Sequence, residues 1–348
     1  MTVVPEIDMP GHTNAALHAI PQLNSAGSKP ALKPGETTVP ADGTPNVGYS
    51  SFDAANPVTY EFTKQVLTQI AAMTPGPYLH IGGDESHSTS GADYRTMVDA
   101  FTGQVDALGK TVVGWNETAR TALPRGNAVV QYWAGDKSAV AGAVTGRGAK
   151  MILSPAANTY VPQKQDSRQP QGGTWACGGP CGLDRHYGWD PGTYIPGTSE
   201  SDVLGVESAL WGEFIRRLPQ AQYYSYPRLV ATAEVGWTPQ SQRDYTDFTG
   251  RLAMVGGRLT LQPFRRARPQ GPPGRSPPPP QAPSPAPSPG ATASRRTSRS
   301  PRPVRPASPT CAATPRSPPS RTGRSPPAAP TRPPSPSGRP ARRPWKRR

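Results

Sequence analysis

The chain has 348 residues, a formal net charge of +15 and 47 prolines. Its charge is uneven: residues 261–348 hold 19 Lys and Arg and no Asp or Glu, whereas residues 1–260 hold 19 basic and 23 acidic residues. We therefore expect no nucleic-acid binding by residues 1–260, although a strongly basic chain would otherwise favour it. No apolar stretch is long enough to span a membrane, and the N-terminus lacks a signal-peptide pattern, so we expect no membrane partner.

Short apolar runs alternate with amphipathic stretches along residues 1–260. We expect strands at 2–8, 78–83, 111–117, 128–134, 150–156 and 203–212. A helix is expected at 57–73, because Asn56 can serve as its N-cap and Pro57 as its first residue. Further helices are expected at 94–109, 136–148, 223–237 and 241–257. This alternation predicts a parallel α/β sheet.

Residues 261–348 form a tail of different composition, with more than half of the prolines and much Ser, Ala and Arg. Such a segment has too little apolar surface to offset the entropy of ordering, so we predict disorder. A basic arm that binds polyanions non-specifically is the alternative. We therefore divide the chain into a body, residues 1–260, and this tail.

Polar and aromatic residues follow the expected strands of the body. These groups are Glu6/Asp8/His12, Asp84/Glu85, Trp115/Asn116/Glu117, Trp133, Asn158/Tyr160 and Trp211/Glu213. Side chains gathered at the carboxyl ends of parallel strands are typical of a (β/α)8 TIM-barrel active site. Six strands are visible where a closed barrel needs eight, so we expect a truncated barrel, with residues 160–200 as a long loop over its mouth.

The stretch HIGGDE, residues 80–85, places two glycines before two adjacent carboxylates. Neighbours in a strand point to opposite faces, so Asp84 and Glu85 can serve one site only if the backbone turns there. One carboxyl can then protonate a leaving oxygen while the other orients a neighbouring group. The alternative is that Asp84 caps a helix and Glu85 is a solvated first-turn residue; the other strand-end groups favour catalysis.

Metal chemistry is the weaker interpretation. Cys177 and Cys181, in CGGPC, suit a local disulfide or two free thiols better than a zinc site, for which His186 is the only obvious further ligand. A metallohydrolase built on His80, Asp84 and His87 is weaker still, because His80 should point away from the site. We therefore expect no metal and no cofactor.

HIGGDE resembles the signature of glycoside hydrolase family 20, the β-N-acetylhexosaminidases. EIDMPGH, VGWNE, QYW, SPAANTY, TWA, YGWDP and LWGE are similar to further motifs of that family, in the same order. The resemblance covers about residues 1–260 and implies a (β/α)8 barrel. It also implies removal of terminal β-linked N-acetylglucosamine or N-acetylgalactosamine with retention, the substrate's own 2-acetamido carbonyl acting as nucleophile. Relatives are commonly secreted or lysosomal, and CGGPC is compatible with an extracellular location.

The resemblance also implies roles for individual residues. Glu85 would be the general acid, Asp84 would accept the acetamide N–H, and the Tyr160 hydroxyl would meet the acetamide oxygen. His12 would tune Glu85 without touching the sugar itself. The implied sugar-binding residues are Trp115, Trp133, Trp175, Trp211 and Glu213. For Trp133 and His12, ordinary packing is the alternative.

The chain departs from the family pattern in places. EIDMPGH resembles the third barrel strand, so we expect the first two strands to be missing, with an arginine that grips the sugar and an acidic partner of His12. Pro162 stands where many relatives carry an aspartate. These departures predict a fragment or a misread reading frame that is poorly stable or inactive. A non-catalytic carbohydrate-binding remnant is therefore the alternative function.

Overall fold

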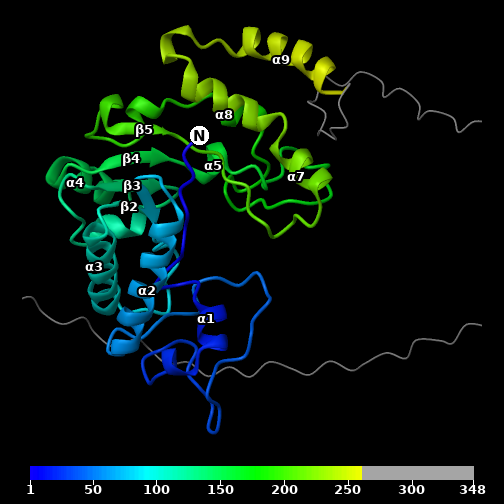
Figure 1. Ribbon diagram of the computed structural model, residues 1–348. Helices are drawn as coiled ribbons and strands as arrows, with labels where there is room; N and C mark the ends of the chain where they lie inside the picture. Colours follow the sequence, from blue (N-terminus) through cyan, green and yellow to red (C-terminus); the bar gives the residue numbers. More distant parts are fainter. Residues whose placement is uncertain (261–348) are drawn as a thin grey trace, which may run out of the picture. The chain divides into compact units, whose positions relative to one another are not determined.

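The computed structural model describes residues 1–260 (Figure 1). The predicted disordered tail lies outside the described residues. Five parallel strands form one sheet in the order β1-β2-β3-β4-β5. Their bounds are Tyr78–His80, Thr111–Trp115, Ala128–Tyr132, Lys150–Leu153 and Val203–Val206. Sequential order of parallel strands joined by helices is the arrangement of consecutive units in a β/α barrel, as the sequence predicts.

The predicted first strand, 2–8, lies beside β1 but is only partly strand-like. Ile7 N donates to His80 O at 3.0 Å, and Met9 N donates to Ile81 O at 3.0 Å. Glu6 forms an isolated parallel bridge with His80. Val3 is exposed, so the prediction was wrong for the first residues of the run. Proline at both ends of residues 5–10 withholds the N–H groups that a longer ladder needs.

The predicted strands 78–83 and 203–212 are also too long. Strand β1 ends at His80, and Gly82 and Gly83, two and three residues later, adopt φ of 69° and 98°. Strand β5 ends at Val206, and the chain then leaves the sheet toward Trp211 and Glu213. An apolar run shows that residues are buried, but it does not show where the backbone turns.

The longer helices follow their capping signals. Helix α2, Pro57–Met73, has the predicted bounds, and Asn56 Oδ1 accepts the Val58 N–H at 3.0 Å. Helix α3, Gly91–Ala107, begins earlier than predicted because Ser90 caps it. Asp136 caps α4, Lys137–Arg147. The predicted helix 223–237 is wrong as a single element.

That segment forms two helices, α7, Leu218–Ser225, and α8, Arg228–Trp237. Pro227, which has no N–H to donate, lies between them. Helix α9, Tyr245–Thr260, ends the described region. The shorter helices are α1 Asn14–Ala19, α5 Ala156–Thr159 and α6 Leu183–Tyr187, with 3₁₀ turns η1 Pro21–Leu23, η2 Asn116–Arg120, η3 Pro191–Thr193, η4 Glu200–Asp202 and η5 Gln240–Gln242.

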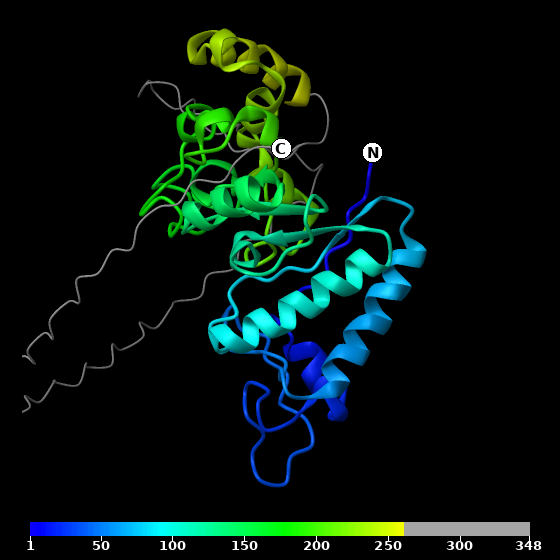
Figure 2. The ribbon, with the colours of Figure 1, turned by 90° about the vertical axis from the view of Figure 1, so that its left-hand side faces the viewer.

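The main core lies between the sheet and helices α2, α3 and α4. Figure 2 shows α2 and α3 side by side, and Tyr60 of α2 meets Phe101 of α3 with ring centroids 6.1 Å apart. Fully buried members from helices and strands include Leu67, Phe101, Val105, Val130 and Met151. Within residues 1–260, no helix has both the length and the apolar content needed to cross a bilayer. This core fixes the strands whose carboxyl ends carry the predicted site.

Candidate active site

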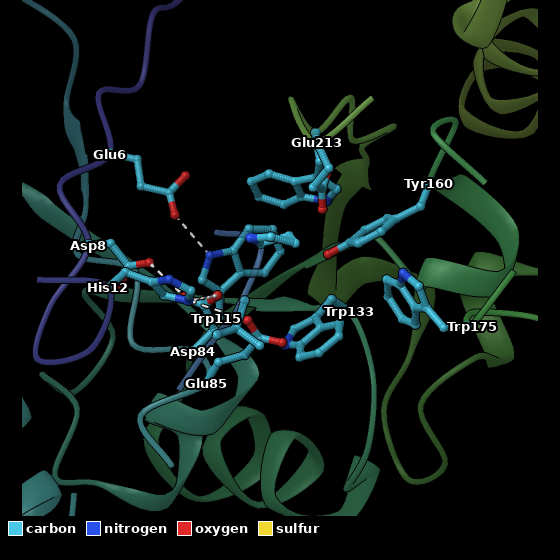
Figure 3. A pocket seen from close by; sticks show the side chains of 13 residues that line it. Glu6, Asp8, His12, Asp84, Glu85, Trp115, Trp133, Tyr160, Trp175 and Glu213 are labelled. Atoms are coloured by element: carbon cyan, nitrogen blue, oxygen red, sulfur yellow. Dashed lines mark hydrogen bonds and ion pairs between the residues drawn. The ribbon is translucent and has the colours of Figure 1, made fainter. Parts of the chain in front are cut away.

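A pocket of about 620 Å³ opens at the carboxyl ends of the strands (Figure 3). All nine predicted site residues line it: His12, Asp84, Glu85, Trp115, Trp133, Tyr160, Trp175, Trp211 and Glu213. Four residues that were not predicted as site residues complete the lining: Glu6, Asp8, Pro45 and Val47. One pocket therefore collects residues that are spread over 208 positions of sequence.

The backbone turn after β1 brings the two adjacent carboxylates to the same place. Gly82, Gly83 and Glu85 all have positive φ, and Glu85 has φ 49°. A Cβ on Gly82 would collide with the Asp8 carboxylate, so this position also requires the smallest side chain. Neither carboxylate caps α3, since Ser90 does so. The helix-capping alternative for Asp84 and Glu85 is therefore wrong.

His12 lies between the carboxylates of Asp84, Glu85 and Asp8 and lines the pocket. Its Nε2 is 3.4 Å from Asp84 Oδ2, 3.3 Å from Glu85 Oε2 and 4.0 Å from Asp8 Oδ2. Hydrogen bonds to Asp84 and then to Glu85 raise the pKa of His12 to about 10, against the opposing effect of burial. The described residues thus supply three acidic neighbours for His12.

Asp8 and Asp84 share this environment but shift in opposite directions. Burial, followed by the charge of Asp84, raises the pKa of Asp8. Burial also opposes ionisation of Asp84, but the hydrogen bond and the charge of His12, together with a hydrogen bond from Asp8, outweigh it and lower the pKa of Asp84. Asp8 further accepts the Gly83 N–H at 3.0 Å. At neutral pH the cluster therefore holds a protonated Asp8, a cationic His12 and an ionised Asp84.

Trp115 and Trp211 form one side of an aromatic wall. Trp115 is buried, with 3% of the residue exposed, and its indole N–H donates to Glu6 Oε1 at 2.8 Å. Its centroid lies 5.9 Å from that of Trp211, which in turn lies 5.8 Å from Tyr160. Burial raises the pKa of Glu6 to about 6, although the indole hydrogen bond lowers it. The hydrogen bond fixes the plane of the Trp115 ring within the pocket.

Tyr160, Trp133 and Trp175 form the other side of the wall. Trp133 and Tyr160 stack with an interplanar angle of 13° and centroids 6.5 Å apart. Trp175 meets both rings edge to face, at 6.1 Å and 5.9 Å. Trp175 remains 57% exposed, whereas Tyr160 is buried. Burial raises the pKa of Tyr160, so its hydroxyl keeps its proton and can donate a hydrogen bond.

The long loop that carries Trp175 is held by covalent and polar contacts. Cys177 and Cys181 form a disulfide, which settles the choice among disulfide, thiols and zinc. The buried guanidinium of Arg228 donates to the carbonyls of Cys181, Val161 and Gln163. These contacts attach the Trp175 loop to α8. Glu213 is exposed and lies at the pocket lining without a fixed polar partner among the described residues.

Two histidines of the metallohydrolase alternative lie outside this pocket's lining. His80 is buried, accepts the Gly82 N–H at 2.9 Å and packs against Trp115 with centroids 5.3 Å apart. Burial lowers the pKa of His80 to about 4, so it is neutral. The described ligand-type atoms that lie close together are those of Asp8, His12 and Asp84, all within 4.8 Å of one another.

Sequence reasoning placed Glu6, Asp8 and Glu117 among the strand-end groups but assigned them no role in the site. Glu6 and Asp8 belong to the EIDMPGH motif and follow the first extended segment, which is the signal that could have identified them. Glu117 follows Trp115 in the same way and accepts the Trp133 indole N–H, with its two oxygens 3.3 and 3.2 Å from Nε1. Pro45 and Val47 come from an irregular loop, and no pattern marks them.

Comparison with known proteins agrees with this geometry. The model of the glycosyl hydrolase family 20 catalytic domain matches residues 1–101 and 92–240. A β-N-acetylhexosaminidase of Cellulomonas fimi is 41% identical over 254 residues, covering 72% of this chain and 48% of that protein. A β-hexosaminidase of Porphyromonas gingivalis is 29% identical and covers 75% of this chain and 34% of its own length. The chain spans about half the length, or less, of these curated relatives.

Solved structures show the same likeness. The family 20 β-N-acetylhexosaminidase of Streptomyces coelicolor A3(2) aligns with a TM-score of 0.70 and 39% identity, covering 77% of this chain and 53% of that one. A mutant Streptomyces plicatus β-hexosaminidase in complex with product (GlcNAc) aligns with a TM-score of 0.70 and 40% identity, covering 77% and 52%. The predicted fold class, part of a (β/α)8 TIM barrel, is confirmed. By its motifs, its fold and these matches, the chain belongs to glycosyl hydrolase family 20.

Proposed function

We propose that the chain is a retaining exo-β-N-acetylhexosaminidase that hydrolyses terminal β-linked N-acetylhexosamine by substrate-assisted catalysis. The observation that carries this proposal is the placement of Asp84 and Glu85 around the same nitrogen of His12, opposite a wall of five aromatic rings. The N-acetylhexosaminidase names of the relatives, and the product complex of one of them, support N-acetylglucosamine-type glycans as substrates. No cofactor or metal is required by this chemistry.

The arrangement of the two carboxylates favours a division of labour between them. Asp84 is ionised and can accept the N–H of a 2-acetamido group, which turns the acetamide oxygen toward the anomeric carbon. That oxygen forms a bond to C1 while the glycosidic C1–O bond breaks, giving an oxazolinium ring. Glu85 gives its proton to the departing oxygen. Water then attacks C1, Glu85 takes a proton from it, and the ring opens to the retained sugar.

The remaining pocket residues support binding and charge balance. The rings of Trp115, Trp133 and Trp211 offer flat apolar faces for the C–H surfaces of the sugar. The protonated hydroxyl of Tyr160 can donate to the acetamide oxygen as the ring closes. His12 Nε2 lies 3.3 Å from Glu85 Oε2, and its raised pKa lets it carry a positive charge that balances the charge of Asp84.

The test is hydrolysis of an aryl N-acetyl-β-D-glucosaminide by the full chain, beside Glu85→Gln and Asp84→Asn. We expect turnover by the unmodified chain and a loss of roughly 100-fold or more in each variant, the usual contribution of a positioned acid or base. The matched control is Asp136→Asn, whose side chain caps α4 outside this pocket. Turnover that survives in both carboxylate variants would contradict the proposal.

An inactive but folded chain would favour the non-catalytic carbohydrate-binding alternative. Titration of the same chain with N-acetylglucosamine, followed by tryptophan fluorescence, separates the two functions. Binding without turnover supports the alternative, and turnover supports the enzyme.

We also propose that the chain works outside the cytosol. The Cys177–Cys181 disulfide supports an oxidising compartment, because glutathione keeps most cytosolic thiols reduced. We expect the protein in the extracellular or periplasmic fraction, with Cys177 and Cys181 joined in the disulfide and neither available to a thiol reagent. Recovery from the cytosol with two free thiols would contradict it.

A further inference from the structure

Arg228, the first residue of α8, is a fully buried cation that forms an ion pair with no acid in the part of the chain that the structure describes. Burial lowers its pKa to about 10, so the guanidinium still carries its charge at neutral pH. A buried charge without a counter-ion is costly unless hydrogen bonds compensate it. The groups that accept those hydrogen bonds therefore indicate what Arg228 does.

Arg228 and Ser208 hold the backbone on both sides of Tyr160. Arg228 Nη2 donates to the carbonyl oxygen of Val161, the residue after Tyr160. Ser208 Oγ donates to the carbonyl oxygen of Thr159, the residue before it, at 2.7 Å. Tyr160 lines the pocket, whereas neither donor does. The two donors therefore fix the stretch of backbone from which the Tyr160 side chain enters the pocket.

Arg228 also holds the loop that carries Trp175. Its guanidinium donates to the carbonyl oxygens of Gln163, at 2.7 Å, and Cys181, at 3.1 Å. These two residues precede and follow Trp175 in the sequence. The Gln163 side chain in turn accepts the backbone N–H of Ala176, the residue after Trp175, at 3.4 Å. One cation thus anchors the loop on both sides of Trp175.

Tyr160 and Trp175 are neighbours in the pocket, with their ring centroids 5.9 Å apart in an edge-to-face contact (Figure 3). We propose that Arg228 is a positioning residue that, together with Ser208, holds these two rings in place without touching the sugar. This inference rests on the proposed hydrolase function for its kinetic consequence, though not for its structural one.

The geometry of the guanidinium explains why an arginine is needed here. Its planar fork donates to several carbonyls at once, which the single nitrogen of a lysine ammonium cannot do in the same arrangement. Without the fork, the Tyr160 hydroxyl no longer meets the acetamide oxygen in one orientation. Closure of the oxazolinium ring then slows, because a donor stabilises developing charge only when it is already in position.

The kinetic test is a double-mutant cycle of Arg228→Lys and Tyr160→Phe, measured as kcat/KM on an aryl N-acetyl-β-D-glucosaminide. With Tyr160 present, we expect Arg228→Lys to lower kcat/KM about tenfold, part of the roughly 100-fold that a 1 Å misplacement can cost. In the Tyr160→Phe background the hydroxyl is already absent, so the same change should cost about threefold or less. Arg243→Lys is the matched control and should match the unmodified chain, because Arg243 donates to the Tyr187 carbonyl at 3.2 Å, outside the pocket.

A purely structural role for Arg228 predicts a different pattern. Misfolding or a smaller folded fraction lowers the rate by the same factor in both backgrounds. Equal losses in the two backgrounds, or no loss in either, would therefore overturn the proposal. If Arg228→Lys does not fold, Ser208→Ala takes its place in the cycle, and the same two results overturn the proposal there.

A measurement independent of activity completes the test. The Trp175 indole N–H resonance is identified by its disappearance in Trp175→Phe, and its chemical shift depends on the neighbouring ring of Tyr160. We expect Arg228→Lys, or Ser208→Ala in its place, to move that resonance, and Arg243→Lys to leave it unmoved. If the unmodified chain shows no turnover but the resonance moves, the positioning role stands and the proposed hydrolase function fails. A resonance that stays unmoved overturns the positioning role in either case.

Discussion

Replacing Gly82 by alanine should destabilise the fold by more than the cost of a positive φ alone. Gly82 has φ 69°, and a Cβ there would meet the Asp8 carboxylate, which already accepts the Gly83 N–H at 3.0 Å. A positive φ costs an alanine about 1 kcal/mol, and forcing an extra methyl group into a packed site costs about 1–3 kcal/mol more. We therefore expect Gly82→Ala to destabilise the fold by about 3 kcal/mol in total.

Gly126 provides the matched control, because it has φ 68° and nothing within 4 Å of an added Cβ. Gly126→Ala should cost about 1 kcal/mol, the price of the backbone conformation alone. Thermal unfolding measures both, since 1 kcal/mol shifts Tm by about 2–4 °C in a domain of this size. Equal shifts for the two variants would refute the reasoning, because they would show that Asp8 does not restrict Gly82.

Three further predictions concern the aromatic wall, the histidine cluster and the disulfide. Trp115→Phe keeps a buried ring but removes the N–H that Glu6 accepts at 2.8 Å, so unfolding in urea should show a loss of about 1 kcal/mol; an unchanged midpoint would contradict this. The folded pKa of His12 is about 10 against an ordinary value of 6.5, so its stabilising effect is complete below pH 6.5 and is lost as pH rises toward 10. The Tm of the unmodified chain should fall over that pH range, and the Tm of His12→Gln should fall less. If the two curves of Tm against pH run parallel, His12 does not stabilise the fold through its acidic neighbours. Reducing the Cys177–Cys181 disulfide, which joins residues of sequence separation 4, should lower the free energy of unfolding by about 2 kcal/mol through loop entropy. The stability of a Cys177→Ser, Cys181→Ser variant should not change with reductant. An equal loss of stability in that variant would contradict the disulfide.

The sequence predicted best those helices whose ends are set by neighbouring residues, such as an N-cap or a proline. Asn56 followed by Pro57 marks the start of α2, and the structure has that helix at the predicted bounds. Pro227 was an equally local signal for the break between α7 and α8, and it was overlooked. The ends of β1 and β5 depend on where the backbone leaves the sheet, which apolar content alone does not show.

The residues of the candidate site also fall into those that local motifs predict and those that only the fold brings together. Residues that belong to recognisable motifs, such as Glu85 and Tyr160, were predicted, and the structure places them in one pocket. The roles of the acids behind the aromatic rings were not predicted because their partners are distant in sequence: Glu6 and Trp115 are 109 residues apart. Pairings of that kind arise only when strands come together, so single-sequence patterns carry little trace of them.

The central claim is that the substrate's own acetamido group is the nucleophile, oriented by Asp84 and assisted by Glu85. The most direct measurement is kcat/KM for aryl β-glucosaminides whose N-acetyl group carries zero, one, two or three fluorine atoms. Fluorine withdraws electrons from the carbonyl oxygen and weakens its attack on C1. We predict a steep fall in kcat/KM with each added fluorine. Rates that do not change with fluorination would contradict the account, because the acetamide would then take no part in the step that breaks the glycosidic bond.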